Sequence, residues 1–192
     1  MQKRQIILFT MRVNLVIGIS CLIFAILIIG CSKKEKTLPE EPQSDVYQER
    51  INRLVNDGLD FKLGDSVNEI IKTLGQPKDI KVEKERNVHY PNEIMDEIHR
   101  LYYDGLSIEI YKATEGNKEL LQTLSVTSNK FKVKLGLNVG VTKPEIKRAL
   151  GRPSKDRGNA WSYVCTDGYE HEVRFYFAND KVNKIEWSYW ID

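Results

Sequence analysis

The sequence predicts an α+β fold of two tandem repeats, each a short helix (or helix pair) packed on a three-stranded antiparallel meander. Two observations lead to this prediction. A block of sixteen residues recurs 76 positions further along the chain with the same helix-boundary residues. After each copy, apolar and polar residues alternate, which is the period of a strand that buries one face. These patterns leave open whether the two sheets join.

The repeated block covers residues 62–77 and 138–153, which align without gaps. Ser66 in one copy and Thr142 in the other are N-cap residues, and a glutamate three residues later completes each capping box. A glycine followed two residues later by a proline ends both helices. The identical pairs are Gly64/Gly140, Glu69/Glu145, Ile70/Ile146, Leu74/Leu150, Gly75/Gly151 and Pro77/Pro153. The block predicts one short helix per repeat, and capping explains both glutamates without a catalytic role.

Strand-like segments follow each helix. The first expected hairpin has Asp104-Gly105 at its tip, a dipeptide typical of a type I′ turn. The six expected strands are residues 98–103, 106–111 and 119–128 in the first repeat and 160–165, 171–177 and 182–190 in the second. A leading helix, capped by Ser44, is expected from Asp45 to about Asn56. Residues 81–96 are interpreted as an insertion, a loop with part of a strand.

The first thirty residues are typical of a bacterial lipoprotein export signal. Basic residues precede an uncharged, largely apolar run that extends from Val13 to Ser32. The run contains Ile28-Ile29-Gly30-Cys31, which resembles the bacterial lipobox. That resemblance implies a diacylglycerol on the sulfur of Cys31 and cleavage before it, and acyl chains worth about 0.8 kcal/mol per buried methylene hold such a protein on a membrane. An uncleaved transmembrane helix is the alternative, and a start at Met11 would shorten the leader.

These observations give the expected organisation of the chain. We expect a lipoprotein signal peptide over residues 1–30 and a flexible polar tether over 31–44. The first repeat with its leading helix then covers 45–128, and the second repeat covers 129–192. The expected location is the bacterial cell envelope, with the exported protein lipid-anchored on the periplasmic face of the outer membrane or on the cell surface.

Charge and cysteine content narrow the classes of partner. The chain of 192 residues has a formal charge of +2, of which the leader supplies +3, so residues 31–192 carry about −1. A nearly neutral body argues against a nucleic-acid partner, which needs a basic face. It gives no sign of a polybasic membrane patch beyond Lys33, Lys34 and Lys36. Cys165 lacks a partner cysteine in the folded part, so we interpret it as a buried strand residue, with a reactive or intermolecular thiol as the alternative.

Several motifs occur together, the first three in both repeats and the last two in the second repeat. They are a leading glycine, a Ser/Thr-x-x-Glu helix, Leu-Gly-x-Pro, the strand Trp161-Ser162-Tyr163 and the hairpin from Phe177 to Ile185. This set resembles the SmpA/OmlA (BamE-like) family of outer-membrane lipoproteins over residues 58–190. The resemblance implies two helices on a three-stranded antiparallel sheet and a role in envelope assembly. The tandem arrangement further resembles β-lactamase inhibitory protein, in which two such units form one curved sheet. Because the first copy has a longer insertion, the family's partner surface is not carried over.

The sequence predicts no catalytic, metal or cofactor site. His89, His99 and His171 do not have the spacing of metal ligands, and no phosphate-binding loop or nucleophile motif occurs. Acidic residues at Glu93, Asp96 and Glu97 cluster in the insertion, but nothing places them at an acid–base spacing on a rigid element. We expect no small-molecule cofactor.

The strand pattern does suggest a binding surface. Helices cover only one face of such a sheet, so the other face is expected to be open. The side chains expected there are Tyr102, Tyr111, Arg174, Tyr176 and, at the end of the last strand, Trp190. Tyr, Trp and Arg supply much of the binding energy at protein interfaces, although ordinary cross-strand pairing is the alternative interpretation.

The expected function is therefore a cell-envelope binding module, held to the membrane by lipid on Cys31, that binds another envelope protein. One version is a scaffold in envelope assembly. The alternatives are an inhibitor of a secreted hydrolase of the β-lactamase or lysozyme type and an envelope enzyme with its site in the insertion.

Overall fold

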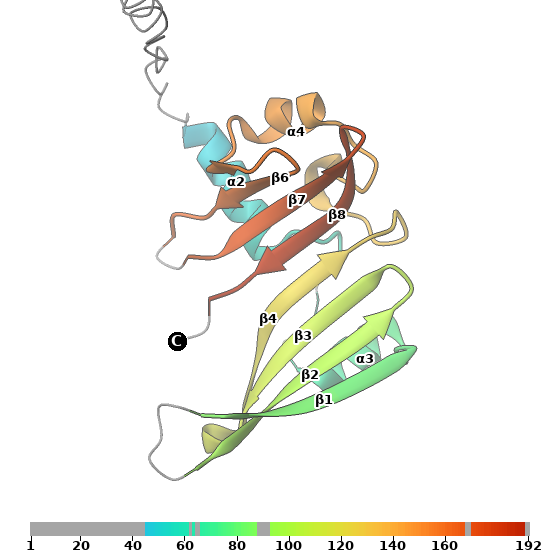
Figure 1. Cartoon of the computed structure of the whole chain (residues 1–192), viewed down its shortest axis with the longest axis vertical. Coiled ribbons are helices and arrows are strands. Elements are labelled where there is room, and N and C mark those ends of the chain that lie inside the picture. Colours follow the sequence, from blue (N-terminus) through green and yellow to red (C-terminus); the bar gives the residue numbers. More distant parts are fainter. Residues whose placement is uncertain (1–44, 62, 64–65, 88–92, 168–169, 191–192) are drawn as a thin grey trace, which may run out of the picture. The chain divides into compact units, whose positions relative to one another are not determined.

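The computed structural model describes residues 45–61, 63, 66–87, 93–167 and 170–190, all within one compact unit, Pro42–Asp192. Eight strands form a single antiparallel sheet in the order β1-β2-β3-β4-β8-β7-β6-β5 (Figure 1). The strands are β1 (Asp79–Arg86), β2 (Met95–Tyr103), β3 (Leu106–Ala113), β4 (Lys118–Val126), β5 (Lys155–Asp156), β6 (Ala160–Val164), β7 (Glu172–Ala178) and β8 (Lys181–Ser188). The helices of the described part are α2 (Asp45–Asn56), α3 (Val67–Leu74) and α4 (Lys143–Leu150), with short 3-10 turns at Glu115–Asn117 and Lys134–Gly136.

The predicted fold class, two tandem repeats each packed on a three-stranded meander, is wrong because the strands form one eight-stranded sheet. The sequence had left open whether the two meanders join, and the structure shows that they do. β4 pairs antiparallel with β8, which places Leu124 opposite Trp187 and Val126 opposite Ile185. Each of these strands would otherwise end its meander with a row of unpaired backbone groups, and their pairing removes both edges. All four side chains belong to one hydrophobic core that continues across the two halves.

The predicted strand count is also wrong, because each half of the sheet contains four strands. Much of the presumed insertion belongs to β1, which pairs with β2 along its whole length, from Asp79 opposite Tyr102 to Arg86 opposite Met95. Every residue of β1 is exposed, so this strand lacks the alternation of buried residues on which the prediction relied. β5, a two-residue strand, pairs with β6 at the other edge.

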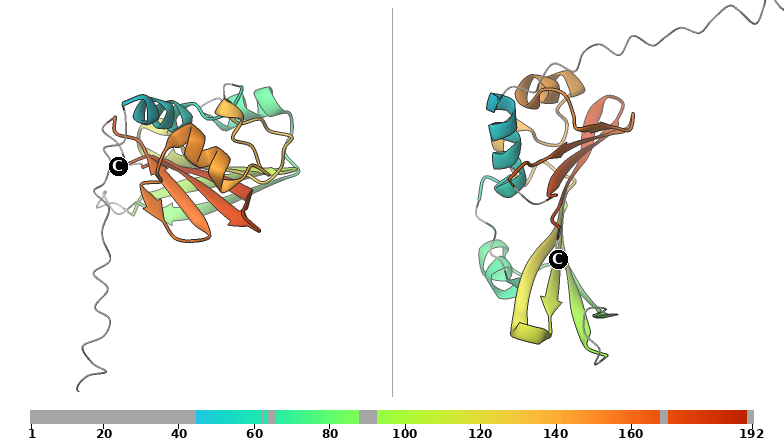
Figure 2. Two further views of the ribbon diagram at one scale, coloured as in Figure 1. Left: turned by 90° about the horizontal axis from the view of Figure 1, so that it is seen from above. Right: turned by 90° about the vertical axis from the view of Figure 1, so that its left-hand side faces the viewer.

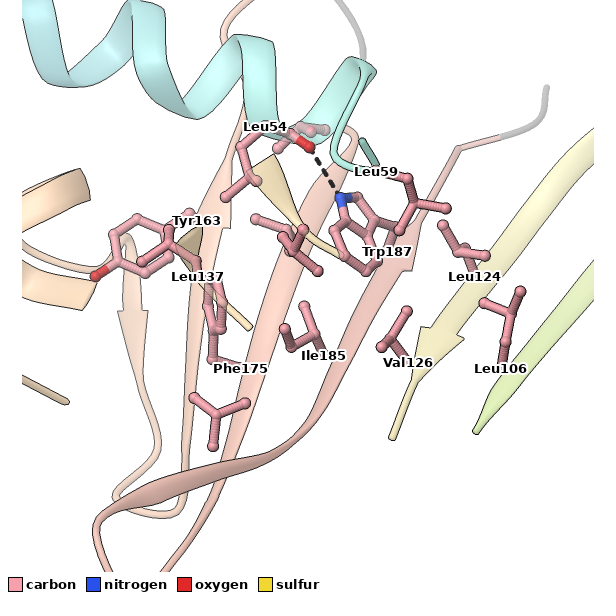
Figure 3. Close-up of a cluster of buried hydrophobic side chains, with 14 of the residues drawn as sticks. Leu54, Leu59, Leu106, Leu124, Val126, Leu137, Tyr163, Phe175, Ile185 and Trp187 are labelled. Carbon is pink, nitrogen blue, oxygen red and sulfur yellow. Dashed lines mark hydrogen bonds between the residues drawn. The ribbon is translucent and has the colours of Figure 1, made fainter. Parts of the chain in front are cut away.

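The leading helix has the predicted bounds but packs on the other half of the molecule. α2 contacts α4, β6 and β7, and the indole Nε1 of Trp187 on β8 donates a hydrogen bond to the Leu54 carbonyl at 2.9 Å (Figure 3). Both residues are fully buried. A Cβ at Gly58 would lie 2.6 Å from the Trp187 ring, so this approach requires glycine. The expected cap of the helix, Ser44, lies outside the described residues.

The two repeated helices begin where the sequence predicted. α3 follows Ser66, whose Oγ accepts a hydrogen bond from the backbone N–H of Glu69 at 3.3 Å. α4 follows Thr142, whose backbone N–H donates to Glu145 Oε2 at 2.7 Å in a capping box. The glycines at the two C-caps have φ of +80° and +73°, a region that side chains disfavour.

The tight turns differ from the prediction in one respect. At the tip of the β2–β3 hairpin only Gly105 has a positive φ, +87°, whereas a type I′ turn needs two such residues. The β7–β8 turn meets that requirement, with φ of +51° at Asn179 and +59° at Asp180.

All three described helices lie on the same face of the sheet (Figure 2). The strand residues under them are the buried apolar set, which includes Leu106, Ile108, Ile110, Leu124, Val126, Val173, Phe175, Ile185 and Trp187. Alternation along each strand sends the remaining side chains to the opposite face, which no described helix covers.

Candidate protein-binding surface

We call the sheet surface opposite the helices the open face. Strand register defines rows of neighbouring side chains that cross it. One row contains Asp79, Tyr102, Ser107, Ser125, Glu186, Arg174, Ser162 and Lys155, one from each strand. The next contains Lys81, Arg100, Glu109, Thr123, Ser188, Glu172 and Val164. Tyr102 and Arg174 lie in the first row, and alternation along β3 and β7 puts Tyr111 and Tyr176 on the same face. Four of the five predicted binding residues therefore lie on the open face, in its two halves.

The Arg174 cluster occupies the half formed by β6, β7 and β8. Its members are Ser162, Glu172, Arg174, Tyr176, Lys184 and Glu186. The Arg174 guanidinium donates to Ser162 Oγ at 3.2 Å and to Tyr176 Oη at 3.1 Å, and it forms ion pairs with both glutamates. Tyr176 Oη in turn donates to Glu186 Oε1 at 2.9 Å, and Lys184 Nζ lies 3.9 Å from the Tyr176 ring centroid. Lys184 Nζ also lies 2.7 Å from Glu186 Oε2, so every charged group of the cluster has a partner of opposite charge.

Electrostatics keep this cluster ionised. Burial alone favours the neutral form of Arg174, but its bond with Tyr176 and the nearby glutamates raise the pKa of the guanidinium. Burial likewise favours neutral Glu186, yet hydrogen bonds from Lys184 and Tyr176 lower the pKa of its carboxyl. The result is a charge-balanced array with fixed donors and acceptors. Such an array loses little side-chain entropy when a partner binds.

The Arg100 cluster occupies the half formed by β1, β2 and β3, and its members are Lys81, Glu83, Arg100, Tyr102 and Glu109. Arg100 Nη1 lies 2.6 Å from Glu83 Oε2, and its Nε pairs with Glu109. These two bonds raise the pKa of the guanidinium. Lys81 Nζ lies 5.5 Å from the centroid of the Tyr102 ring, within the range of a cation–π contact. The cluster repeats the combination of arginine, tyrosine and paired acids found in the other half.

Tyr111 has a more structural setting. Its hydroxyl donates to the carboxylate of Asp96, which is fully buried. The same carboxylate accepts from Asn87 Nδ2 at 2.7 Å and from the backbone N–H of Thr114 at 2.8 Å. Although burial raises the pKa of Asp96, the hydrogen bonds from Tyr111, Thr114 and Asn87 lower it below its ordinary value. The Tyr111 hydroxyl is thus used within the fold, which leaves the ring as its contribution to the open face.

The remaining predicted residues are not brought into either cluster. Trp190 lies beyond the end of β8, is 61% exposed, and its backbone N–H donates to His171 Nδ1 at 2.9 Å. Cys31 lies outside the described residues. The sequence reasoning missed Arg100, which has the same parity as Tyr102 and could have been found by alternation. It also missed Glu186, whose place beside Arg174 follows only from the β7–β8 register.

The described residues hold no group of three His, Cys, Asp or Glu side chains that could bind a metal ion. A shallow pocket of about 340 Å³ is formed by the segment that connects β4 to α4 and by the start of α4, and it is lined by Asn129, Lys132, Asn138, Val139, Gly140, Val141 and Glu145. Two of its polar groups serve the fold, since Asn138 Oδ1 accepts from the Val133 N–H and Glu145 caps α4. Cys165 is 4% exposed, and burial raises the pKa of its thiol, which opposes reactivity.

Comparisons with known proteins identify no relative. No protein family matches the chain, and neither the curated proteins nor the solved structures contain a match. The resemblance to the SmpA/OmlA family therefore depends on the quoted motifs alone. Within the described part of the chain, the helices are too short or too polar to cross a membrane, and residues 1–30 lie outside that part.

Proposed function

We propose that this chain is a lipid-anchored binding protein of the bacterial cell envelope, whose open face contacts another envelope protein. The observation that carries the proposal is the sheet face that none of the described helices covers, where two clusters present Arg and Tyr side chains already held in place. These residue types are enriched at the energetic centres of interfaces. The small side chains of Ser107, Thr123, Ser125 and Ser188 lie between the two clusters.

The chemistry of the open face favours binding over catalysis. Glu186 has a lowered pKa and is held by Lys184 and Tyr176, so it is an ionised, fully hydrogen-bonded carboxylate at neutral pH. A general acid or base works best when its pKa lies near the working pH. The paired charges suit electrostatic complementarity with a protein partner, which governs specificity and the rate of association.

The membrane anchor comes from the sequence around Cys31. Acyl chains on its sulfur would hold the binding unit at the membrane through the tether of residues 31–44. The test is mass spectrometry of protein extracted from its native membrane. We expect an N-terminal Cys31 carrying acyl chains, and a protein that retains residues 1–30 would contradict the anchor.

The binding surface can be tested by site-specific photo-crosslinking in intact cells. A photoreactive phenylalanine at Tyr102 or at Tyr176 should cross-link to the same protein, because both positions lie on the open face. The matched control is Lys72, which is exposed on α3 on the covered side of the sheet. A cross-link only from the photoreactive residue at Lys72, or no cross-link from Tyr102 and Tyr176, would contradict the proposed surface.

A variant set then separates binding from folding. Arg174→Lys with Tyr176→Phe keeps one positive charge and one ring but removes the fixed donors, and we expect the Tyr102 cross-link to weaken at least tenfold. Arg53→Ala with Lys72→Ala, both exposed on helices, should leave it unchanged. Circular dichroism of each variant shows whether the fold is retained.

A further inference from the structure

A dense group of unpaired bases lies on α4 and the segment that follows it. Between residues 147 and 157 the sequence has five bases and one acid, Asp156. The five bases are Lys147, Arg148, Arg152, Lys155 and Arg157, and all are exposed. We call them the basic patch. None forms an ion pair with a carboxylate of the described residues, whereas Arg100, Lys134 and Arg174 do.

The patch stands out against the charge of the rest of the protein. Residues 147–157 have a net charge of +4, while residues 31–192 sum to about −1, so the other residues of that range carry about −5. Lys147 and Arg148 lie in the last turn of α4, where bases stabilise a helix C-terminus. That effect does not account for Arg152, Lys155 and Arg157, which follow the helix.

The fold places this patch beside the start of α2, where the described part of the chain begins. The start of α2 packs on the end of α4, and both helices lie at the same end of the unit (Figure 1). A Cβ at Gly151 would lie 3.1 Å from the Tyr47 ring, and Arg50 Nη1 donates to the Ala149 carbonyl at 3.2 Å. The exposed charges of α2 itself, two acids and two bases, cancel.

The length of the tether limits how far the patch can lie from a bilayer. Residues 31–44 separate the proposed lipid from Asp45. Fourteen residues span at most about 50 Å when fully extended. A flexible polar chain of that length has a root-mean-square span of only about 20 Å. Because the tether leads to α2, the neighbouring basic patch is among the first surfaces to approach the membrane.

We propose that the basic patch docks on the anionic headgroups of the membrane that holds the lipid anchor. The proposal depends on the proposed anchoring at Cys31, which brings the patch to the bilayer. A basic side chain near an anionic surface contributes about a fivefold gain in membrane partitioning. Lys33, Lys34 and Lys36 in the tether add charge of the same sign. Docking would fix the end of the binding unit that faces the membrane, in addition to the single attachment point at the lipid.

Vesicle sedimentation tests the docking without the anchor. The protein is residues 32–192, which retains every described helix and strand and lacks the lipid. The probes are vesicles of phosphatidylcholine alone and of phosphatidylcholine mixed with phosphatidylserine. We expect binding to the anionic vesicles only, with loss at about 0.5 M salt, where charges are screened beyond a few ångströms.

Two triple variants locate the site. Arg148→Gln, Arg152→Gln and Lys155→Gln together should weaken binding to the anionic vesicles about 100-fold, from three steps of about fivefold. The control removes three exposed lysines elsewhere, Lys72→Gln, Lys84→Gln and Lys118→Gln, and should bind nearly as wild type.

Three results would overturn the docking proposal. They are failure to bind anionic vesicles, an equal loss in both triple variants, and equal affinity for a short DNA duplex at the same salt, which would indicate a general polyanion site. Because this assay uses unlipidated protein, its outcome is independent of acylation at Cys31. Failure of the open-face cross-links would likewise leave the vesicle result unaffected, so the two proposals fail separately.

Discussion

The packing of α2 on β8 predicts an unusually large cost for a single methyl group at Gly58. A Cβ at this position would lie 2.5 Å from the Leu54 carbonyl oxygen and 2.6 Å from Nε1 and Cζ2 of Trp187. Trp187 is fully buried and cannot move aside without losing its hydrogen bond to that carbonyl. Overpacking of this kind costs about 1–3 kcal/mol. We expect Gly58→Ala to lie in the upper half of that range.

A second substitution isolates the contribution of the indole. Trp187→Phe removes Nε1 and Cζ2, so the buried Leu54 carbonyl loses its partner at a cost of about 1–3 kcal/mol, with a further cost for the cavity. In that background Gly58→Ala still meets the Leu54 carbonyl oxygen at 2.5 Å but no longer meets the indole, so it should cost about 1–2 kcal/mol less than in wild type. The double-mutant cycle should therefore give a coupling of about 1–2 kcal/mol.

Urea unfolding of residues 32–192, followed by circular dichroism, measures each free energy of unfolding. Arg53→Ala, an exposed change on the same helix, is the matched control and should stay within about 0.5 kcal/mol of wild type. If Gly58→Ala is equally mild, or if its cost is the same with Phe at position 187, the close packing of α2 on β8 is refuted.

Two further predictions concern buried and capping groups. In Asp96→Asn, at least one of the three donors faces an amide N–H₂, so we expect a loss of about 1–3 kcal/mol at pH 7. Because the pKa of Asp96 lies below its ordinary value of 3.8, its stabilisation is present above that pH and is lost as pH falls through the folded-state pKa. The difference between wild type and Asp96→Asn should therefore shrink in acid, and a difference that does not change with pH would contradict the assignment. Thr142→Ala should cost about 1 kcal/mol in urea unfolding through loss of the α4 cap, whereas Thr127→Ala, exposed and outside any helix, should be nearly neutral.

Local signals predicted the helices and most strands well because those signals act over a few residues. The N-caps at Ser66 and Thr142, with glycine and proline after the last turn, are sufficient to set helix ends. β1 escaped prediction because an edge strand exposed on both sides carries no burial pattern. The β4–β8 pairing escaped because apolar residues such as Leu124 and Trp187 show that a strand has a buried face, but not which strand lies beside it.

The candidate surface was predictable in the same partial way. Alternation assigned Tyr102, Tyr111, Arg174 and Tyr176 to one face, since parity along a strand needs only local information. Their partners required the register between strands, which depends on the whole sheet. The basic patch was hidden for a related reason: its charge is visible in the sequence, but its place beside α2 follows from packing between segments about 100 residues apart.

The junction at the centre of the sheet determines when this molecule can finish folding. β4 can complete its pairing only with β8, which comes much later in the chain. The Leu54 carbonyl likewise receives its hydrogen bond from Trp187, 133 residues later. During synthesis or export from the N-terminus, the edge of β4 and the buried face of α2 therefore stay uncovered until β8 and Trp187 have emerged. A chain truncated before Trp187 could neither pair the edge of β4 nor bury the apolar face of α2. Such a truncation should therefore leave an aggregation-prone, protease-sensitive fragment.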